Sequence, residues 1–190
     1  MKKIKLCVFF IFVLCGTFSC IMNPNLRTAR ILNKGELEVS TGVVAASKAA
    51  YSPVFIGAYG LSKYVELELK CMNEMGGLVP RFQILRSKES WIDFLISTEV
   101  GYNWDESGWY FAPGAMVGRK MGCFEPYLSW QFAKYRSVKA DVIAQYILIG
   151  NRFHLPSPKL TKWFIGVESG LIATPFTVHL QYAMNLGFIY

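Results

Sequence analysis

The chain has little charge, no long apolar run after its start, and only two histidines. Charged residues make up 17% of the 190, although 53% are hydrophobic; a typical soluble domain is about 25% charged. Beyond the first twenty residues no apolar run reaches the roughly 18 residues that a membrane-spanning helix needs. Apolar content without such a helix favours a single membrane β-barrel, because helices and closed barrels are the only spanning structures that satisfy the backbone.

The charge and the cysteines exclude several other classes. Lys2, Lys3 and Lys5 lie in the leader, so the mature chain carries about +4 rather than +7, and no basic patch with interleaved aromatics indicates a nucleic-acid partner. The sequence has no CxxC motif or Cys/His cluster with metal-site spacing, no glycine-rich phosphate loop and no nucleotide fingerprint. We therefore expect no cofactor and no metal.

Residues 1–19 are typical of a secretory signal peptide. A basic start is followed by an apolar core from Leu6 to Leu14 and by mostly small or polar residues up to Ser19. Ser19 before Cys20 resembles the lipobox of bacterial lipoproteins, which implies a lipid on Cys20; Thr17 and Phe18 depart from that motif. The alternative is ordinary cleavage near Ser19, which leaves Cys20 unmodified.

Residues 20–34 are expected to be an N-terminal tether, and residues 35–190 the barrel. Cys71 and Cys123 both lie in predicted strands, and the sequence leaves open whether they form a disulfide.

The last fourteen residues alternate between an apolar and a mostly polar set. Every second residue is large and apolar: Val178, Leu180, Tyr182, Met184, Leu186, Phe188 and Tyr190. A period of two predicts a strand with one oily face, and the length suffices for a tilted membrane strand, which needs about 9–11 residues.

This segment resembles the C-terminal strand of Gram-negative outer-membrane β-barrels. In that family the barrel-assembly machinery recognises alternating apolar residues that end on an aromatic. The corresponding residues in this chain are Tyr182, Leu186, Phe188 and Tyr190. The resemblance implies location in the cell outer membrane. It also implies three partners: membrane lipid, lipopolysaccharide and the assembly machinery. We expect a monomer.

Ten strands are predicted, with eight as the alternative. The candidates lie near residues 36–46, 51–60, 63–71, 77–86, 91–102, 108–118, 122–133, 141–153, 162–173 and 177–190. The predicted fold class is all-β, a single antiparallel transmembrane barrel. An even number of strands places both ends in the periplasm.

Alternation alone fits either a membrane barrel or a soluble periplasmic lipid-binding barrel with its faces inverted. The composition of the polar face favours the membrane barrel, because this face is rich in small and uncharged residues rather than in the Lys and Glu of a water-facing surface. The apolar face carries aromatics near strand ends, as in the girdles of membrane barrels: Trp91, Tyr102, Trp109, Trp130, Trp163, Tyr182 and Tyr190.

If the polar face points inward, a network of charges fills the lumen. The predicted members are Glu38, Glu66, Glu68, Lys70, Arg81, Asp93, Glu99, Glu125 and Glu168, with Arg119 and Arg152 as further candidates. Acids outnumber bases in this set, so water, raised pKa values or a weak cation preference must offset the surplus. The two functions that follow are a closed, ion-paired structural barrel and a narrow pore.

An outer-membrane enzyme acting on lipid A acyl chains is the other class considered. His179 faces inward near the outer rim, but Gln181 rather than Ser follows at the next inward position, and Asp105 and Glu106 are expected only to solvate a loop. We therefore predict no catalytic residues. A cluster of Lys134, Tyr135, Arg136 and Lys139 is expected at the outer rim, solvated or touching lipopolysaccharide phosphates.

Overall fold

A computed structural model of the chain describes residues 24–46, 50–87, 90–104, 106–136, 141–157 and 161–190. Its elements are ten strands: β1 (Leu37–Ala46), β2 (Ala50–Gly60), β3 (Val65–Met72), β4 (Met75–Leu85), β5 (Asp93–Asn103), β6 (Gly108–Gly118), β7 (Phe124–Arg136), β8 (Asp141–His154), β9 (Lys162–Ala173) and β10 (Val178–Ile189). The predicted boundaries agree within three residues. In the described part of the chain no helix has the length and apolar character to cross a membrane.

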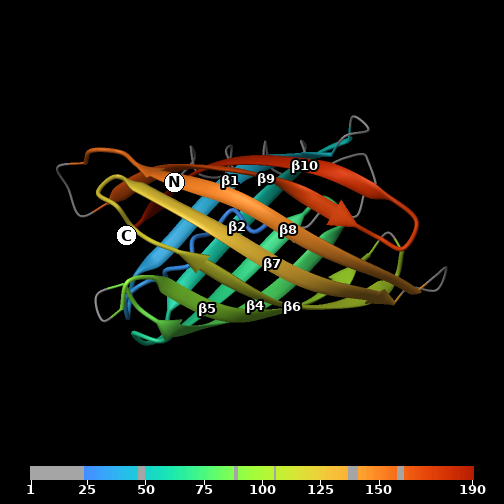
Figure 1. The fold of residues 1–190 in the computed structure, drawn as a ribbon, viewed down its shortest axis with the longest axis horizontal. Coiled ribbons are helices and arrows are strands. Elements are labelled where there is room, and N and C mark those ends of the chain that lie inside the picture. The colour runs from blue at the N-terminus through green and yellow to red at the C-terminus, as the bar shows by residue number, and fades with distance from the viewer. Residues whose placement is uncertain (1–23, 47–49, 88–89, 105, 137–140, 158–160) are drawn as a thin grey trace, which may run out of the picture.

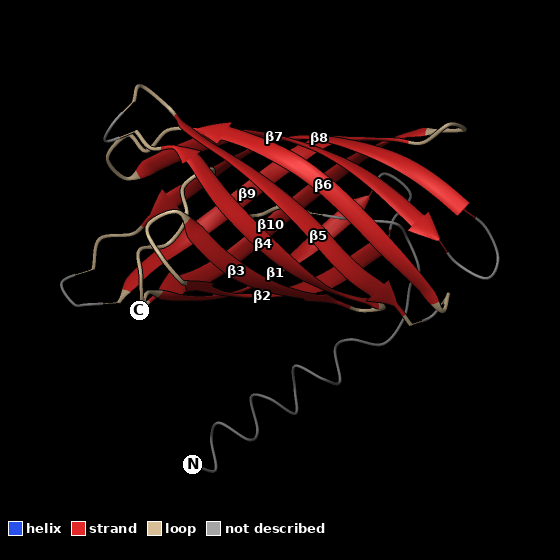
Figure 2. Cartoon of the chain, turned by 90° about the horizontal axis from the view of Figure 1, so that it is seen from below, coloured by secondary structure: helices blue, strands red, loops and turns tan. Residues whose placement is uncertain are grey.

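The strands form one closed antiparallel barrel (Figures 1 and 2). Each strand pairs with its neighbours in sequence, and β1 closes the circle by pairing with β10, with Val43 opposite Met184. A register shift between Gln83 and Leu85 in β4 is the one irregularity among the described pairings. The ten-stranded prediction is therefore confirmed, and the eight-stranded alternative is excluded.

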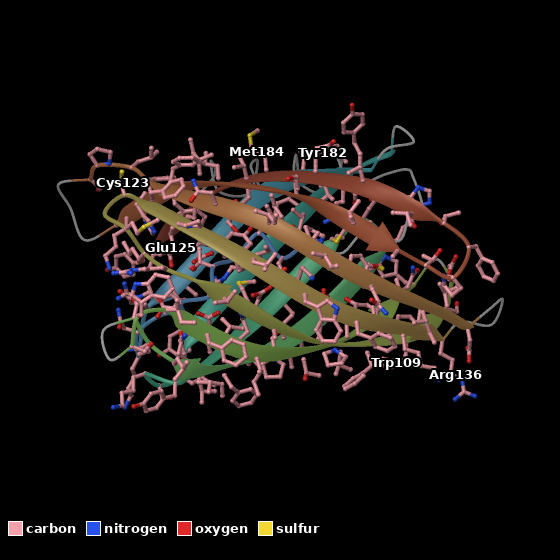
Figure 3. All side chains as sticks on the ribbon, viewed as in Figure 1. Trp109, Cys123, Glu125, Arg136, Tyr182 and Met184 are labelled. Carbon is pink, nitrogen blue, oxygen red and sulfur yellow. The ribbon has the colours of Figure 1, made fainter. Side chains whose placement is uncertain are left out.

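The apolar side of the wall faces outward. Along β10, Tyr182 and Met184 point away from the barrel (Figure 3), whereas Gln181, Ala183 and Asn185, which alternate with them, are buried. The other strands expose large apolar side chains in the same way, among them Leu69, Ile96, Leu128, Ile147 and Leu171. Period-two alternation thus separates an oily exterior from a polar interior, as the sequence predicts.

The two ends of the barrel carry different groups. Cys123 and Glu125 lie at the end that holds the C-terminus, and Trp109 and Arg136 at the opposite end (Figure 3). Six of the seven aromatics predicted for the girdles are exposed near strand ends or along the outer wall. The seventh, Tyr102, is partly buried and packs edge-on against Trp109 with ring centroids 4.9 Å apart.

Three sequence-based placements differ from the structure. Tyr135 is not a rim residue, because it points into the lumen and its hydroxyl lies 2.9 Å from that of Tyr146. Cys123 precedes β7 rather than lying in a strand, and Cys71 and Cys123 are free thiols. Lys139 and Asp105 lie outside the described residues.

The segment expected to be a tether instead runs inside the barrel. Residues 24–32, hereafter the lumen segment, have no regular secondary structure, and seven of the nine are buried. Leu26, Ile31 and Leu32 pack into three separate clusters of buried wall residues. The chain leaves the lumen at Asn33 and turns into β1 at the end where the C-terminus lies.

Candidate functional site

The inward positions of the strands place the predicted lumen charges together. All nine predicted residues are buried, and so is Arg152. Arg119 is the exception: it is exposed, and its guanidinium lies 5.5 Å from the ring centre of Trp91. It is therefore not a lumen residue.

Arg27 of the lumen segment lies at the centre of these charges. Its side chain is 1% exposed. One guanidinium nitrogen lies 2.8 Å from Glu38 Oε1, another contacts Glu66, and Nε lies 3.7 Å from Glu68. One cation therefore joins three acids from two wall strands, β1 and β3.

Two wall arginines complete the charge balance around Arg27. Arg81 Nη1 lies 3.1 Å from Glu66 Oε1 and 3.7 Å from Glu68 Oε2. Arg152 binds Glu38 through both nitrogens of its fork, at 2.9 and 3.0 Å, and its Cζ lies 3.9 Å from the ring centre of Phe164. Three arginines thus face three glutamates, so no net charge is left in this layer.

A second ion pair lies beside the start of the lumen segment. Lys70 Nζ lies 2.6 Å from Glu99 Oε2 and also donates to the carbonyl of Pro24 at 3.3 Å. The other oxygen of Glu99 accepts from the Tyr110 hydroxyl at 2.7 Å. The pair is therefore tied both to the wall and to the lumen segment.

The wall also satisfies the backbone of the lumen segment. Glu168 accepts from the amides of Asn25 and Leu26, each at 3.0 Å, and from the Tyr127 hydroxyl at the same distance. The irregular segment lacks ladder partners, so these side chains replace the hydrogen bonds that a strand would make.

Two more wall residues bond that backbone. Glu66 Oε2 accepts from the Leu32 amide at 2.7 Å. Gln83 both accepts from the Ile31 amide and donates to the Ala29 carbonyl, at 3.0 Å each. Polar wall residues therefore hold the segment along its whole described length.

Two of the predicted acids lie apart from the arginine layer. Glu125 Oε2 lies 2.7 Å from His154 Nε2 near the end that holds the C-terminus. Asp93 accepts from the Ser87 amide at 2.8 Å, and its second oxygen has no hydrogen-bond partner within the described residues.

Beyond the ion pairs, towards the end that carries Trp109 and Arg136, apolar and tyrosine side chains fill the lumen. One cluster joins Val44, Met72, Met75 and Ile172 with the rings of Tyr110, Tyr135 and Tyr146. The rings of Tyr110 and Tyr135 stack with centroids 5.3 Å apart. Polar and apolar layers thus follow one another along the bore.

The described residues bring no catalytic or metal-binding group together. Over the ranges that the structure describes, no three His, Cys, Asp or Glu side chains are placed to hold a metal ion. His179 makes no hydrogen bond to another described residue, and Gln181 beside it is fully buried. No nucleophile is therefore placed against His179.

Sequence reasoning missed Arg27, the residue with the most ion pairs among those described. Nothing periodic marks residues 24–32, so the sequence predicts only a tether there. The signal that could have found it is the surplus of acids over bases among the inward wall residues, which calls for a cation from elsewhere in the chain.

Comparisons with known proteins give structural likeness only. No protein-family model matches the chain, and no curated protein matches it. Among solved structures, a de novo designed transmembrane β-barrel is 14% identical, with 84% of this chain and 98% of that one covered and a TM-score of 0.42.

Two natural barrels give similar values. The N-terminal β-barrel domain of Pseudomonas aeruginosa OprF is 10% identical, covering 84% of this chain and all of that one, with a TM-score of 0.40. Neisserial surface protein A is 14% identical, covering 81% and 94%, with a TM-score of 0.31. At these scores the likeness carries no inference about function.

Proposed function

We propose that the protein is a structural outer-membrane β-barrel whose lumen is closed by its own N-terminal segment. The observation that carries this is Arg27, buried in the bore and paired with Glu38, Glu66 and Glu68. A water-filled pore would leave such charges hydrated, whereas a closed lumen requires them to be paired.

The outer wall supports the membrane part of the proposal. Its exposed side chains are leucines, isoleucines, valines and aromatics, a composition that would aggregate in water and suits contact with lipid. The proposed location is the outer membrane, reached through the assembly machinery with Tyr182, Leu186, Phe188 and Tyr190 as the signal, and with lipid and lipopolysaccharide as partners.

The proposal extends to the N-terminus of the mature chain. Cys20 lies outside the described residues, and its lipidation remains part of the proposal. Mass spectrometry of the mature protein tests it: a diacylglycerol adduct on the Cys20 sulfur supports lipidation, and an unmodified Cys20 thiol contradicts it.

Conductance distinguishes the closed barrel from the narrow pore. Purified protein that shows heat-modifiable gel migration is inserted into planar bilayers, with a porin as the positive control. A closed barrel gives no current steps above baseline. Regular steps from the folded protein would contradict closure and favour the narrow, weakly cation-selective pore.

A further inference from the structure

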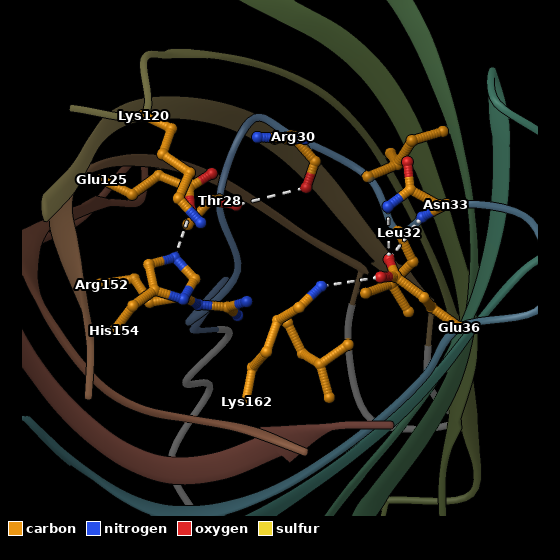
Figure 4. Close-up of a pocket in the computed structure, with 12 residues that line it drawn as sticks. Thr28, Arg30, Leu32, Asn33, Glu36, Lys120, Glu125, Arg152, His154 and Lys162 are labelled. Atoms are coloured by element: carbon orange, nitrogen blue, oxygen red, sulfur yellow. Dashed lines mark hydrogen bonds and ion pairs between the residues drawn. The ribbon is translucent and has the colours of Figure 1, made fainter. Parts of the chain in front are cut away.

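A small pocket opens between the lumen segment and the wall, at the end that holds the C-terminus (Figure 4). Its volume is about 50 Å³. That is more than one water needs, since a single water occupies roughly 10–15 Å³ of such space. The lumen segment contributes Thr28 and Arg30, and the wall and turns contribute Lys120, Arg152, His154 and Lys162.

Cations outnumber acids around this pocket. Arg30, Lys120, Arg152 and Lys162 line it, whereas its acids are Glu36 and Glu125. Four of these six charges already have partners among the pocket residues or nearby. Lys162 Nζ lies 3.0 Å from Glu36, Arg152 is bound to Glu38 below the pocket, and Glu125 is bound to His154.

Arg30 and Lys120 are left without an ion-pair partner among the described residues. The three arginines of the layer deeper in the lumen are, by contrast, all paired with glutamates. Burial lowers the pKa of the Lys120 ammonium most, and repulsion from Arg30, Lys162 and Arg152 lowers it further against the attraction of Glu125. Positive charge is thus concentrated at a hollow large enough for a small ion.

We propose that this pocket binds a small oxyanion of the phosphate class, either free phosphate or the end of a phosphomonoester. A tetrahedral oxyanion offers acceptors to a lysine point charge and to the planar fork of an arginine at once. Lys120 and Arg30 supply the two charges, while Lys162 and Arg152 add to the positive field from their existing ion pairs. The site lies at the mouth, so it does not depend on whether the bore conducts.

Titration of phosphate into the full chain tests the site. The protein is held folded in a detergent without phosphate, and inorganic phosphate and glycerol 3-phosphate are titrated calorimetrically. Saturable binding of inorganic phosphate alone supports a free anion, and binding of both supports a phosphomonoester end. Absence of saturable binding at millimolar concentrations of either probe overturns the proposal.

Matched variants locate the binding. Lys120→Gln is expected to weaken the affinity by roughly tenfold, because a charged hydrogen bond to the anion is lost. Arg119→Gln removes the neighbouring cation, which lies over Trp91 and outside the pocket, and is expected to leave the affinity within about twofold. Equal weakening by both variants, with heat-modifiable migration intact, would show general charge attraction and contradict the site.

Discussion

At the scale of single residues, the interior is organised by Arg27. A buried carboxylate without a cation loses several kcal/mol of solvation that its neighbours must restore. Glu38, Glu66 and Glu68 all pair with Arg27, and each has a second arginine as well, Arg152 for Glu38 and Arg81 for the other two. The segment therefore forms part of the folded barrel.

Replacing Arg27 by Met should destabilise the barrel strongly. Three buried glutamates then share two arginines, and we expect the free energy of unfolding in lipid vesicles to fall by about 3–5 kcal/mol. Urea unfolding followed by tryptophan fluorescence measures it. Arg30→Met, on the same segment but partly exposed, should cost no more than about 1 kcal/mol. Equal losses in the two variants would contradict the central role of Arg27.

The pH dependence at the mouth follows from Glu36, which lies outside the strands. Burial raises the pKa of its carboxyl, but hydrogen bonds from Asn33 and the ion pair with Lys162 outweigh burial and hold it below the usual value. A depressed acid pKa stabilises the fold above the unfolded value, and this contribution is lost as the pH falls through the folded value.

Glu36→Gln should therefore flatten the acid end of the stability profile. Below about pH 4.5, the usual value for this carboxyl, the free energy of unfolding of the unmodified protein should fall more steeply than that of the variant. Glu106→Gln, which removes an acid near the opposite end, should retain the original slope. Parallel profiles for Glu36→Gln and the unmodified protein would refute the assignment.

At the scale of elements, neighbouring strands leave room for large inward side chains. Tyr127 of β7 lies over Gly150 of β8, so close that a Cβ on Gly150 would come within 2.1 Å of the ring. That position of Tyr127 brings its hydroxyl to Glu168, which in turn holds the lumen segment.

Gly150→Ala should accordingly loosen both the tyrosine and the lumen segment. We expect a loss of about 1–3 kcal/mol in the free energy of unfolding, as for other overpacked interiors. Protease sensitivity near residues 24–32 should rise in parallel. Gly57→Ala is the matched control in a strand, because nothing lies within 4 Å of its added Cβ. If both variants behave alike, Tyr127 is not held as described.

The strands could be predicted from the sequence because their signal is local. Alternation along residues 177–190 or 63–71 needs only the pleat, and together with the turn residues between segments it predicted the ten strands and most of the inward charges. The path of residues 24–32 is set by contacts with distant strands, such as Leu32 with Glu66, 34 residues away, and Leu26 with Glu168, 142 residues away. An irregular segment has no period, so its burial could not be read from its own residues.

At the scale of the whole molecule, the proposed membrane location requires that the apolar face of the wall meets lipid. The same alternation in a soluble barrel would place Leu128 and Trp130 inside and Ser129 and Gln131 in water. The structure has the opposite arrangement, with Ser129 and Gln131 buried and Leu128 and Trp130 exposed. In a bilayer this exterior becomes the favourable surface.

Nitroxide accessibility along β7 tests this most directly. The cysteines are first replaced by serine, and single spin labels are then placed at positions 128 to 131 of protein reconstituted in lipid vesicles. If the apolar face meets lipid, collision rates with dissolved oxygen are high at 128 and 130, and rates with both oxygen and a water-soluble nickel reagent are low at 129 and 131. High nickel accessibility at 128 and 130 would contradict it, because the oily face would then lie in water.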